Sequence, residues 1–403
     1  MQRNHSATPQ RTKKLLVNIQ LFFSNGKLHA YSCLLLLATF IWMAIPYNNG
    51  LDMDIQKWVQ LFKIAFTETK PPPDQIIFID VARSRYLLPV NSDSTENDAI
   101  VNRRYLTQLF GVIAAHQNKV KYVLTDVVFD SPTADDAALK KAIGALGNKF
   151  LSINNYKDDG SLQKNVLGVR AATASTFLQN GSVYKLPLEG SFNDTLVSCK
   201  MYLDMTHEKM WSNFLFTWFV HKGIAFNSQI NDHYLRERDF NGGNYVKIGL
   251  GELTGLLKST PQVFTQYLQN RYILIGDFEN DVHNTYLNAQ PGTLVLFNAY
   301  WHLKNNRQIL SVWYLIVLYL FLYVVMWLQV SEKDYTYHLT LKIIFFEAFT
   351  IPVNIISISI LLIVFTLISS LVFGVNISVF HLIAIFSVID IIKFLVNKLE
   401  NKA

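Results

Sequence analysis

Charged residues are scarce in this chain of 403 residues: they make up 16% of the sequence, and hydrophobic residues make up 50%. Ordinary soluble domains carry about 25% charged residues. The deficit is local, because residues 34–46, most of 309–330 and most of 343–396 are apolar. A run of about 20 apolar residues is long enough to span a bilayer. The composition therefore predicts a membrane part beside an ordinary domain.

Cysteines and catalytic motifs are also scarce. The two cysteines are Cys33, in an apolar run, and Cys199, in the more polar part, so no disulfide within the chain is expected. The sequence contains no Gly-x-Ser-x-Gly, no His-Glu-x-x-His and no phosphate-binding glycine loop. We interpret His116, His207 and His221 as helix-surface residues. No enzymatic activity and no cofactor are expected, and an outward-facing hydrolase is the weakest hypothesis.

Four transmembrane helices are predicted, one N-terminal and three C-terminal, over residues 29–47, 309–330, 348–373 and 377–396. The first run could instead be a cleaved signal peptide. It begins only after 28 residues, however, and it is followed by IPYNNG, which is not a small-residue cleavage site. A retained anchor is the better interpretation.

Lysine and arginine predict the orientation of the spans. Residues 1–28 contain five basic and no acidic residues, so they are expected to form a cytoplasmic tail. Residues 48–308 then form an extracytoplasmic domain, 331–347 a cytoplasmic loop and 397–403 a second cytoplasmic tail. The sequence therefore predicts a multi-pass protein of the inner (plasma) membrane, with the large domain on the periplasmic side and both termini in the cytoplasm.

The net charge of +6 does not indicate a nucleic-acid partner. Residues 48–307 contain 26 Lys plus Arg and 25 Asp plus Glu, so this region is close to +1. The excess positive charge lies in the tails, where it favours anionic lipid.

The segment order in 48–308 predicts an α/β domain with a mainly parallel sheet. An amphipathic helix over 48–70 leads away from the membrane. Buried strands are then expected at 75–80, 121–128, 149–154 and 271–276, with helices at 102–117, 135–147 and 291–305. Residues 155–260 are harder to interpret: we expect a strand and turn at 181–190, a helix that begins near His207, and a strand running into a helix at 244–257.

Acidic residues follow the predicted strands and form the candidate ligand site. Asp80, Asp126 and Asp277 lie at or near the carboxyl ends of three strands, and parallel strands would bring them to one edge. Asp130, Asp281 and His283 are expected nearby. Such a group could bind a cation, or a cationic or polyol ligand. The alternative is that these aspartates cap helices and loop amides.

The acidic stretch DFENDVHN is not a calcium loop of the EF-hand type. Val282 occupies the position that needs glycine, and Asn288 occupies the position that needs the closing glutamate. Whether the site holds a metal is not decided by the sequence.

Three residues of the C-terminal spans are candidates for coupling the domain to the cytoplasm. Glu347 and Asp390 are carboxylates within or beside predicted spans, where charge is costly, and Pro352 could provide a hinge. The alternative is that both carboxylates lie at the cytoplasmic interface.

The order of three segments resembles a known family. These segments are QIIFIDV at 75–81, YVLTDVVFDSPTADDAALKKAI at 122–143, and RYILIGDFENDVHNTYLNAQPGTLVLFNAYWHLKNNRQIL at 271–310, which runs straight into a predicted span. Together with the N-terminal anchor and three C-terminal spans, they resemble the CHASE domain of the second type, a cyclase- and histidine-kinase-associated sensory extracellular domain. The resemblance implies an extracellular sensory function. No cytoplasmic cyclase, kinase or phosphatase domain follows the spans here, so a separate output protein is expected.

Two classes of function remain open. The first is a receptor-like sensory protein that detects a ligand or partner outside and passes the signal through its spans to the output protein. The second is a structural or assembly subunit of a cell-envelope complex, whose outer domain is a docking platform. In both cases the expected partners are the membrane and another protein. A small-molecule or cation ligand belongs to the first class, and oligomerisation is open in both.

Overall fold

The computed structural model describes residues 25–45, 50–66, 70–89, 97–156, 161–163, 165–174, 178–179, 182–189, 194–241, 243–330 and 353–389. The chain divides into two compact units. The helical unit comprises Met1–Trp42, Ser311–Thr366 and Ser378–Ala403. The α/β unit comprises Met43–Leu310 and Leu367–Ile377. Each unit is described by itself below.

A six-stranded sheet forms the centre of the α/β unit, in the order β14-β1-β15-β4-β5-β6. Every neighbouring pair in it is parallel, which confirms the predicted mainly parallel sheet. The inner strands are runs of Val, Ile, Leu and aromatic residues buried on both faces, as expected for a parallel sheet covered on both sides. The strands are β1 (Ile76–Asp80), β4 (Val120–Asp126), β5 (Phe150–Asn154), β6 (Ala171–Thr173), β14 (Val246–Gly249) and β15 (Arg271–Gly276).

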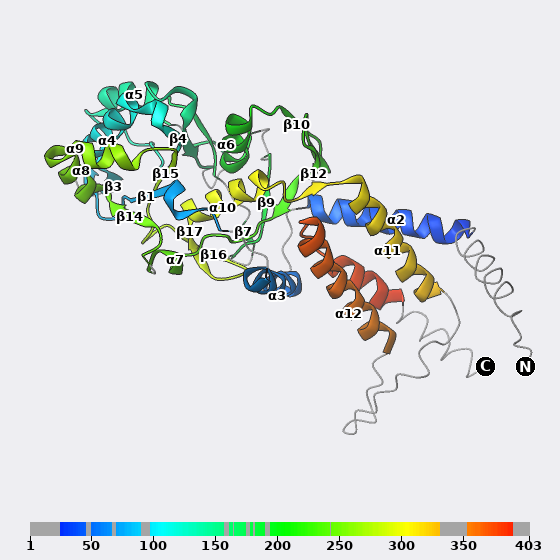
Figure 1. Cartoon of the computed structure of the whole chain (residues 1–403). Helices are drawn as coiled ribbons and strands as arrows, with labels where there is room; N and C mark the ends of the chain where they lie inside the picture. The colour runs from blue at the N-terminus through cyan, green and yellow to red at the C-terminus, as the bar shows by residue number, and fades with distance from the viewer. Residues whose placement is uncertain are drawn as a thin grey trace, which may run out of the picture. The chain divides into compact units, whose positions relative to one another are not determined.

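Helices cover both faces of this sheet (Figure 1). On one face, alternate residues such as Ile79 and Ile275 pack into a core with α4 (Arg103–Ala115), α5 (Asp136–Gly144), α8 (Leu250–Ser259) and α9 (Pro261–Tyr267). On the other face, residues such as Phe78 and Leu274 pack with α6 (Val197–Thr206) and α10 (Gly292–Lys304). The period-2 alternation along each strand decides which residues enter which core.

The crossovers that place the helices follow the expected order. The connection from β1 to β4 contains α4, the connection from β4 to β5 contains α5, and α8 and α9 connect β14 to β15. After the connection from β14, β15 lies between β1 and β4 in the sheet. β15 then leads into α10 on the opposite face of the sheet. The predicted helices at 102–117, 135–147 and 291–305 are thus present as α4, α5 and α10.

The prediction of a helix that begins near His207 is wrong. The helix α6 precedes this position and ends at His207, whose φ of 56° is left-handed. The following residues form β10 (Met210–Ser212), β11 (Phe216–Phe219) and β12 (Gly223–Phe226). Alternation of Phe216, Thr217 and Trp218 suits a strand better than a helix, and Gly223 at φ 113° allows the tight turn into β12. With β18 (Ile309–Leu310), these strands form a sheet of order β10-β11-β12-β18.

Three smaller sheets complete the α/β unit. β2 (Arg85–Pro89) and β3 (Asn97–Val101) form an antiparallel pair beside the end of β1. The predicted strand and turn at 181–190 is present as β8 (Ser182–Val183) and β9 (Lys185–Pro187). β9 pairs with β13 (Ser228–Ile230), and β8 lies between β7 (Leu178–Gln179) and β16 (Val282–Thr285), which also pairs with β17 (Ala289–Pro291). The strand and helix expected at 244–257 are β14 and α8.

Two helices of the described residues are long and apolar enough to cross a membrane: α2 (Gly26–Ala44) and α11, over Val312–Gln329 of Val312–Val330. They correspond to the predicted spans at 29–47 and 309–330. Within the helical unit, Phe321 of α11 stacks on Phe365 of α12 (Val353–Ile368), with ring centroids 3.9 Å apart.

The third and fourth predicted spans are represented by shorter apolar helices, Ile358–Phe373 and Phe380–Ile389, and are therefore not confirmed as spans. α12 continues directly into a five-residue π-helix, Ser369–Phe373. The coupling candidates Glu347, Pro352 and Asp390 lie outside the described residues.

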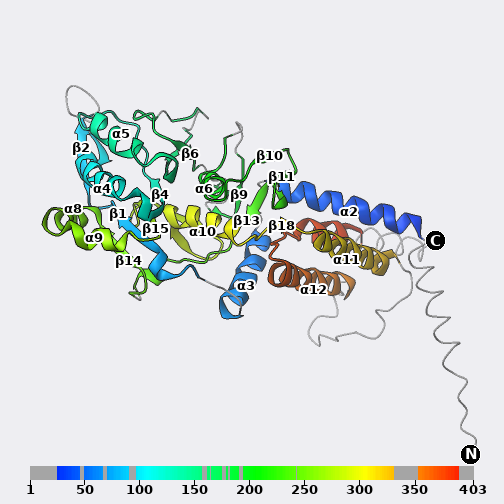
Figure 2. The ribbon, with the colours of Figure 1, turned by 45° about the horizontal axis from the view of Figure 1, so that its top comes forward.

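The predicted amphipathic helix at 48–70 is α3 (Gly50–Phe66), which belongs to the α/β unit. The α/β unit also contains α7 (Arg238–Asn241), a single turn that follows the loop after β13. In the turned view of Figure 2, α3 lies at the end of the unit opposite to α8 and α9.

Candidate functional site

The carboxyl ends of β1, β15 and β4 lie side by side, as the sequence predicts. Asp80 is in register with Gly276, and Gly276 is in register with Asp126. Asp277 follows Gly276 directly. The strands at 121–128 and 271–276 are therefore neighbours in one sheet, and the aspartates do share an edge.

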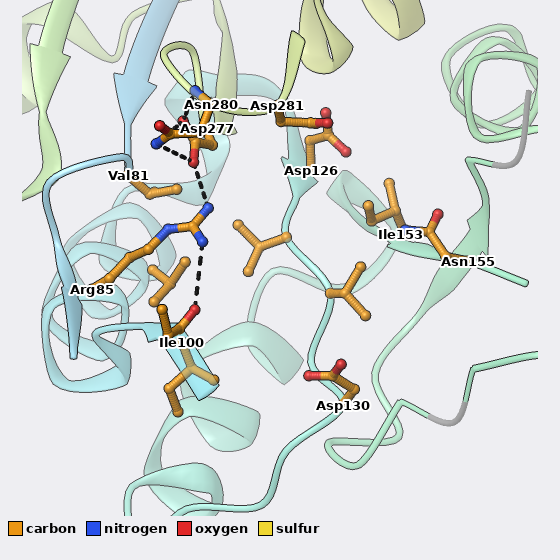
Figure 3. Close-up of a pocket in the computed structure, with 14 residues that line it drawn as sticks. Val81, Arg85, Ile100, Asp126, Asp130, Ile153, Asn155, Asp277, Asn280 and Asp281 are labelled. Atoms are coloured by element: carbon orange, nitrogen blue, oxygen red, sulfur yellow. Dashed lines mark hydrogen bonds and ion pairs between the residues drawn. The ribbon is translucent and has the colours of Figure 1, made fainter. Parts of the chain in front are cut away.

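A cavity of about 450 Å³ opens at this edge (Figure 3). Cavities that bind small molecules usually have volumes of about 300–1,000 Å³. The polar lining of the cavity comes from the carboxyl ends of β4, β5 and β15, with the loops that follow them, and from the β2–β3 hairpin: Arg85, Asp126, Asp130, Asn155, Asp277, Asn280 and Asp281. Its apolar lining is Val81, Ala99, Ile100, Val101, Val127, Val128 and Ile153.

The topology explains why a cavity forms here. The chain leaves β1 and β4 toward helices α4 and α5 on one face, but it leaves the intervening β15 toward α10 on the other face. Adjacent loops that diverge to opposite faces leave a crevice outside the carboxyl ends of the strands, where ligands of α/β proteins bind.

Asp126 is buried at the base of the cavity, against the first turn of α10. Its Oδ2 accepts a hydrogen bond of 2.9 Å from Thr293 Oγ1. Burial and, to a smaller extent, the negative charge of Asp281 raise the pKa of Asp126 to about 7, against the lowering effects of Thr293 and His283. Asp126 is thus a carboxyl group that titrates near neutral pH.

The side chain of Asp281 lies beside that of Asp126 (Figure 3). A Cβ atom at Gly292 would lie 2.5 Å from Asp281 Oδ2 and 3.2 Å from Asp126 Oδ2, so both carboxylates approach the same point of α10. Asp281 Oδ1 also lies 3.1 Å from His283 Nε2. The hydrogen bond with Asp281 raises the pKa of His283 above its ordinary value, and burial opposes this. Glycine at 292 is what allows this close approach.

Asp277 is already well supplied with donors. It accepts hydrogen bonds from the backbone N–H groups of Glu279 (3.0 Å) and Asn280 (2.7 Å), from the side chain of Asn280, and from Arg85. Burial alone would raise the pKa of Asp277, but the hydrogen bonds from Asn280 and Glu279 and the charge of Arg85 lower it overall. Asp277 therefore remains ionised and orders its own loop.

Asp80 does not line the cavity. Its Oδ1 accepts from the N–H groups of Ala82 (3.0 Å) and Phe278 (3.2 Å), and its Oδ2 lies 2.9 Å from Lys247 Nζ. Asp80 shares a face of the sheet with Asp126, but Thr293 packs directly on Gly276, the residue between them. Asp80 therefore caps loop amides, which is the alternative to ligand binding that the sequence left open.

Asp130 lies at another wall of the cavity. Its Oδ2 accepts a hydrogen bond of 2.6 Å from Gln163 Nε2, and its Oδ1 accepts one of 3.3 Å from Ser131 Oγ. The predicted residues Asp126, Asp130, Asp277 and Asp281 therefore line one cavity, with Asp126 and Asp281 paired and the other two held by separate donors.

Sequence reasoning missed Arg85, Asn155 and Asn280. Arg85 begins β2 and contacts Asp277, 192 positions later in the chain, so no local pattern indicates the pair. Asn280 lies within the acidic loop DFENDVHN. A loop aspartate such as Asp277 commonly accepts hydrogen bonds from groups a few residues later in an Asx-type turn, so the local sequence could have indicated this contact.

The geometry does not favour a metal ion. Among the described residues, no group of three or more His, Cys, Asp or Glu side chains is placed to hold one. The cavity offers carboxylate acceptors at three places, which are the Asp126–Asp281 pair, Asp130 and Asp277, and this suits an organic ligand with several donors better than a single ion.

A second buried polar cluster lies at the far end of α10. Asp232 Oδ2 lies 2.8 Å from Lys63 Nζ and 3.4 Å from His302 Nδ1. Asn376 donates to Asp232 Oδ1 at 2.9 Å and accepts from Lys63 at 3.0 Å. Burial opposes ionisation of Asp232, but Lys63 and His302 hold its pKa well below the ordinary value. Sequence reasoning missed this cluster, whose members come from four distant segments.

Comparison with known proteins gives no match to a family model, to a curated protein or to a solved structure. The resemblance to a CHASE domain therefore depends on the order of the three sequence segments and on the predicted spans around them.

Proposed function

We propose that this chain is a membrane-anchored sensory protein whose α/β unit binds a small ligand outside the cytoplasm. The cavity at the carboxyl edge of the parallel sheet is the observation that carries the proposal. A filled and fully capped edge would favour a docking platform; a cavity of about 450 Å³ lined by four aspartates favours ligand binding.

The chemistry of the cavity favours a ligand with positive charge or several hydroxyl groups. Among the described charged residues that line it, four are aspartates and one, Arg85, is a cation. Arg85 is engaged by Asp277, so Asp126, Asp130 and Asp281 leave an excess of acceptors. Ammonium groups and hydroxyls donate to carboxylates, and bonds to charged carboxylates are strong.

Helix α10 is the element that would carry the signal away from the cavity. Its first turn contacts Asp126 through Thr293, and its last turn contacts Asp232 through His302. Between these points, Asn298 donates to Leu235 O (2.8 Å) and accepts from Leu235 N (2.9 Å). Because a helix is stiff, a shift of its first turn would reach the Asp232 cluster, from which residues 374–377 lead to the last predicted span.

Four spans with both termini in the cytoplasm remain our proposed topology. In that arrangement the outer ends of all spans meet the α/β unit. Three contacts within this unit support it: Lys185 Nζ donates to Ile45 O (3.2 Å), Ser228 Oγ to Ala44 O (3.3 Å), and Gln308 N to Gly374 O (3.0 Å). The ends of segments 43–45, 308–310 and 367–377 are thus attached to the same unit, which suits entry into one side of a membrane. We propose the inner membrane, with a separate protein providing the output.

A ligand screen tests the proposed function. The full chain in detergent would be heated with primary, quaternary and polyamines and with sugars and polyols. A true ligand should raise the melting temperature of the wild type. The double variant Asp126→Asn/Asp281→Asn should lose that rise, and Asp74→Asn, which removes an exposed carboxylate outside the cavity, should retain it. Equal responses of all three proteins would overturn the cavity as the sensory site.

The docking platform is the second candidate, and Asp80 is the observation that favours it. This aspartate is fully engaged by Ala82, Phe278 and Lys247, so part of the predicted site has a purely structural use. If no compound stabilises the wild type and a co-purifying envelope protein protects the β2–β3 hairpin from proteolysis, the platform takes precedence.

A further inference from the structure

Helix α3 has its polar face buried and its aromatic face exposed. The buried residues are Asp52, Ile55, Gln56, Val59, Gln60 and Lys63. The exposed side chains include the three aromatic ones, with exposed fractions of 66% for Trp58, 44% for Phe62 and 76% for Phe66, beside Asp54 and Lys57. A helix on the water-facing surface of a domain normally has the opposite arrangement.

The contacts of the polar face fix this orientation. Lys63 pairs with Asp232 at 2.8 Å, Gln56 Nε2 donates to Ile377 O at 2.9 Å, and Gln60 Oε1 accepts from Tyr286 OH at 3.2 Å. Rotating the helix to bury Trp58 and Phe62 would break all three contacts and leave buried polar groups without partners, which is costly. The exposed aromatic face is therefore a stable feature of the α/β unit.

The position of α3 in the chain indicates what covers this face. The apolar helix α2 ends at Ala44, and α3 begins at Gly50, so a few residues separate them. On its inner side, α3 contacts Asn376 and Ile377, the residues that precede the apolar helix Phe380–Ile389. The helix is thus tied, by the chain and by hydrogen bonds, to the ends of apolar segments at both sides.

We infer that α3 lies in the lipid–water interface at the outer ends of the spans, with its aromatic face in a phospholipid bilayer. Trp and other aromatic side chains are favoured at that depth, and an interfacial helix buries its apolar face about 5–10 Å into the boundary of headgroups and acyl chains. Asp54 and Lys57 are exposed on α3 and offset each other, so zwitterionic lipid suffices. The inference rests on the proposed membrane anchoring and is independent of ligand sensing.

Such a helix would hold the α/β unit at a defined depth. Because Lys63 on the same helix joins the Asp232 cluster, the lipid surface would become part of the support for the far end of α10. The interaction surface proposed here is therefore the exposed face formed by Trp58, Leu61, Phe62 and Phe66.

Fluorescence quenching in the full chain tests the inference. Cys33 and Cys199 would be replaced by alanine, and a polarity-sensitive NBD label would be attached to single cysteines at Phe62, at Phe66, or at Val263 as the control. Val263 is on α9 at the opposite end of the unit and matches Phe62 in exposed fraction, 41% against 44%. A fourth label at Leu320 on α11 reports the anchoring itself.

The labelled proteins would be placed in zwitterionic phosphatidylcholine nanodiscs with a shallow lipid spin label, and separately with aqueous iodide. We expect the lipid spin label to quench labels at 62 and 66 while iodide does not, and the reverse at 263. The inference is overturned if the labels at 62 and 66 behave like the label at 263, or if a second copy or a protein partner shields them from both quenchers. In either case, lipid quenching of the label at 320 would still support the anchoring. No lipid quenching at 320 would overturn the anchoring, and the inference with it.

Discussion

Thr293 Oγ1 donates a hydrogen bond of 2.9 Å to Asp126 Oδ2, and the same hydroxyl packs on Gly276. This contact joins the first turn of α10 to the central strands β4 and β15, and it separates Asp126 from Asp80. One threonine thus determines both the shape of the acidic edge and the attachment of the helix that leaves it.

Replacing Thr293 by valine should destabilise the protein. The variant keeps the shape of the side chain but leaves the buried Asp126 without its hydroxyl donor, which we expect to cost about 1–3 kcal/mol. Thermal unfolding of the full chain in detergent measures the effect. Thr293→Ser retains the hydroxyl and should lose less stability than Thr293→Val. Equal losses of stability in the two variants would refute the role of this hydrogen bond.

The stability of the wild type should fall between about pH 4 and pH 7 relative to Asp126→Asn. Folding raises the pKa of Asp126 from 3.8 to about 7, so in this range the folded state binds a proton that the unfolded state has lost. Stability then decreases as pH rises, and the decrease ends above the folded pKa. The difference in melting temperature between the two proteins, measured at pH 5 and pH 8, isolates this group from the others. An unchanged difference would show that Asp126 does not titrate in this range.

An alanine at Gly276 should be poorly tolerated. Its Cβ would overlap Thr293 Oγ1 and lie 3.2 Å from Asp126 Cβ, in a buried and well-packed region. Overpacking of this kind costs about 1–3 kcal/mol. The matched control is Gly255→Ala on the exposed side of α8, where nothing lies within 4 Å; there we expect a gain of about 0.5–1 kcal/mol from helix propensity. Denaturant or thermal unfolding should therefore shift in opposite directions for the two variants.

The buried pair of Lys63 and Asp232 should be sensitive to loss of one partner. Lys63→Met leaves Asp232 buried without its main cation, and such losses cost about 3–5 kcal/mol. The exposed pair of Arg104 and Asp135 provides the comparison: Arg104→Met should cost no more than about 1 kcal/mol. Adding Asp232→Leu to Lys63→Met should recover part of the loss, because the uncompensated charge is removed. A double variant less stable than Lys63→Met would contradict this account.

Cysteine labelling in cells should place the α/β unit outside the cytoplasm. Single cysteines at the exposed positions Ala138 and Ser259, in a background without Cys33 and Cys199, should react with a membrane-impermeant maleimide added outside. Cysteines at Lys13 and Asn401 should react only after permeabilisation. Labelling of Asn401→Cys from outside would contradict the four-span topology.

Local patterns in the sequence predicted the central sheet and its helices. The strands at 75–80, 121–128 and 271–276 each contain a short apolar run (76–79, 122–124 and 272–275), which is typical of a strand buried on both faces. Their alternation with amphipathic helices provides the helical crossovers that neighbouring parallel strands need. The shared edge of Asp80, Asp126 and Asp277 follows from that topology. These conclusions needed no long-range contact.

The tertiary structure decided how the edge is divided and what each side chain does there. Lys247 and the amide of Phe278 bind the carboxylate of Asp80, and they lie 167 and 198 positions away from it. Arg85 binds the carboxylate of Asp277, 192 positions away. The inverted burial of α3 depends on partners just as distant. The strands after His207 pair mainly with one another, and a short aromatic stretch suits a strand or a helix until its neighbours are known. Sequence periodicity determines which residues an element can bury, whereas the specific partner across the core determines which charge is neutralised and which remains open to a ligand. For this reason the sheet could be predicted from the chain alone, and the cavity could not.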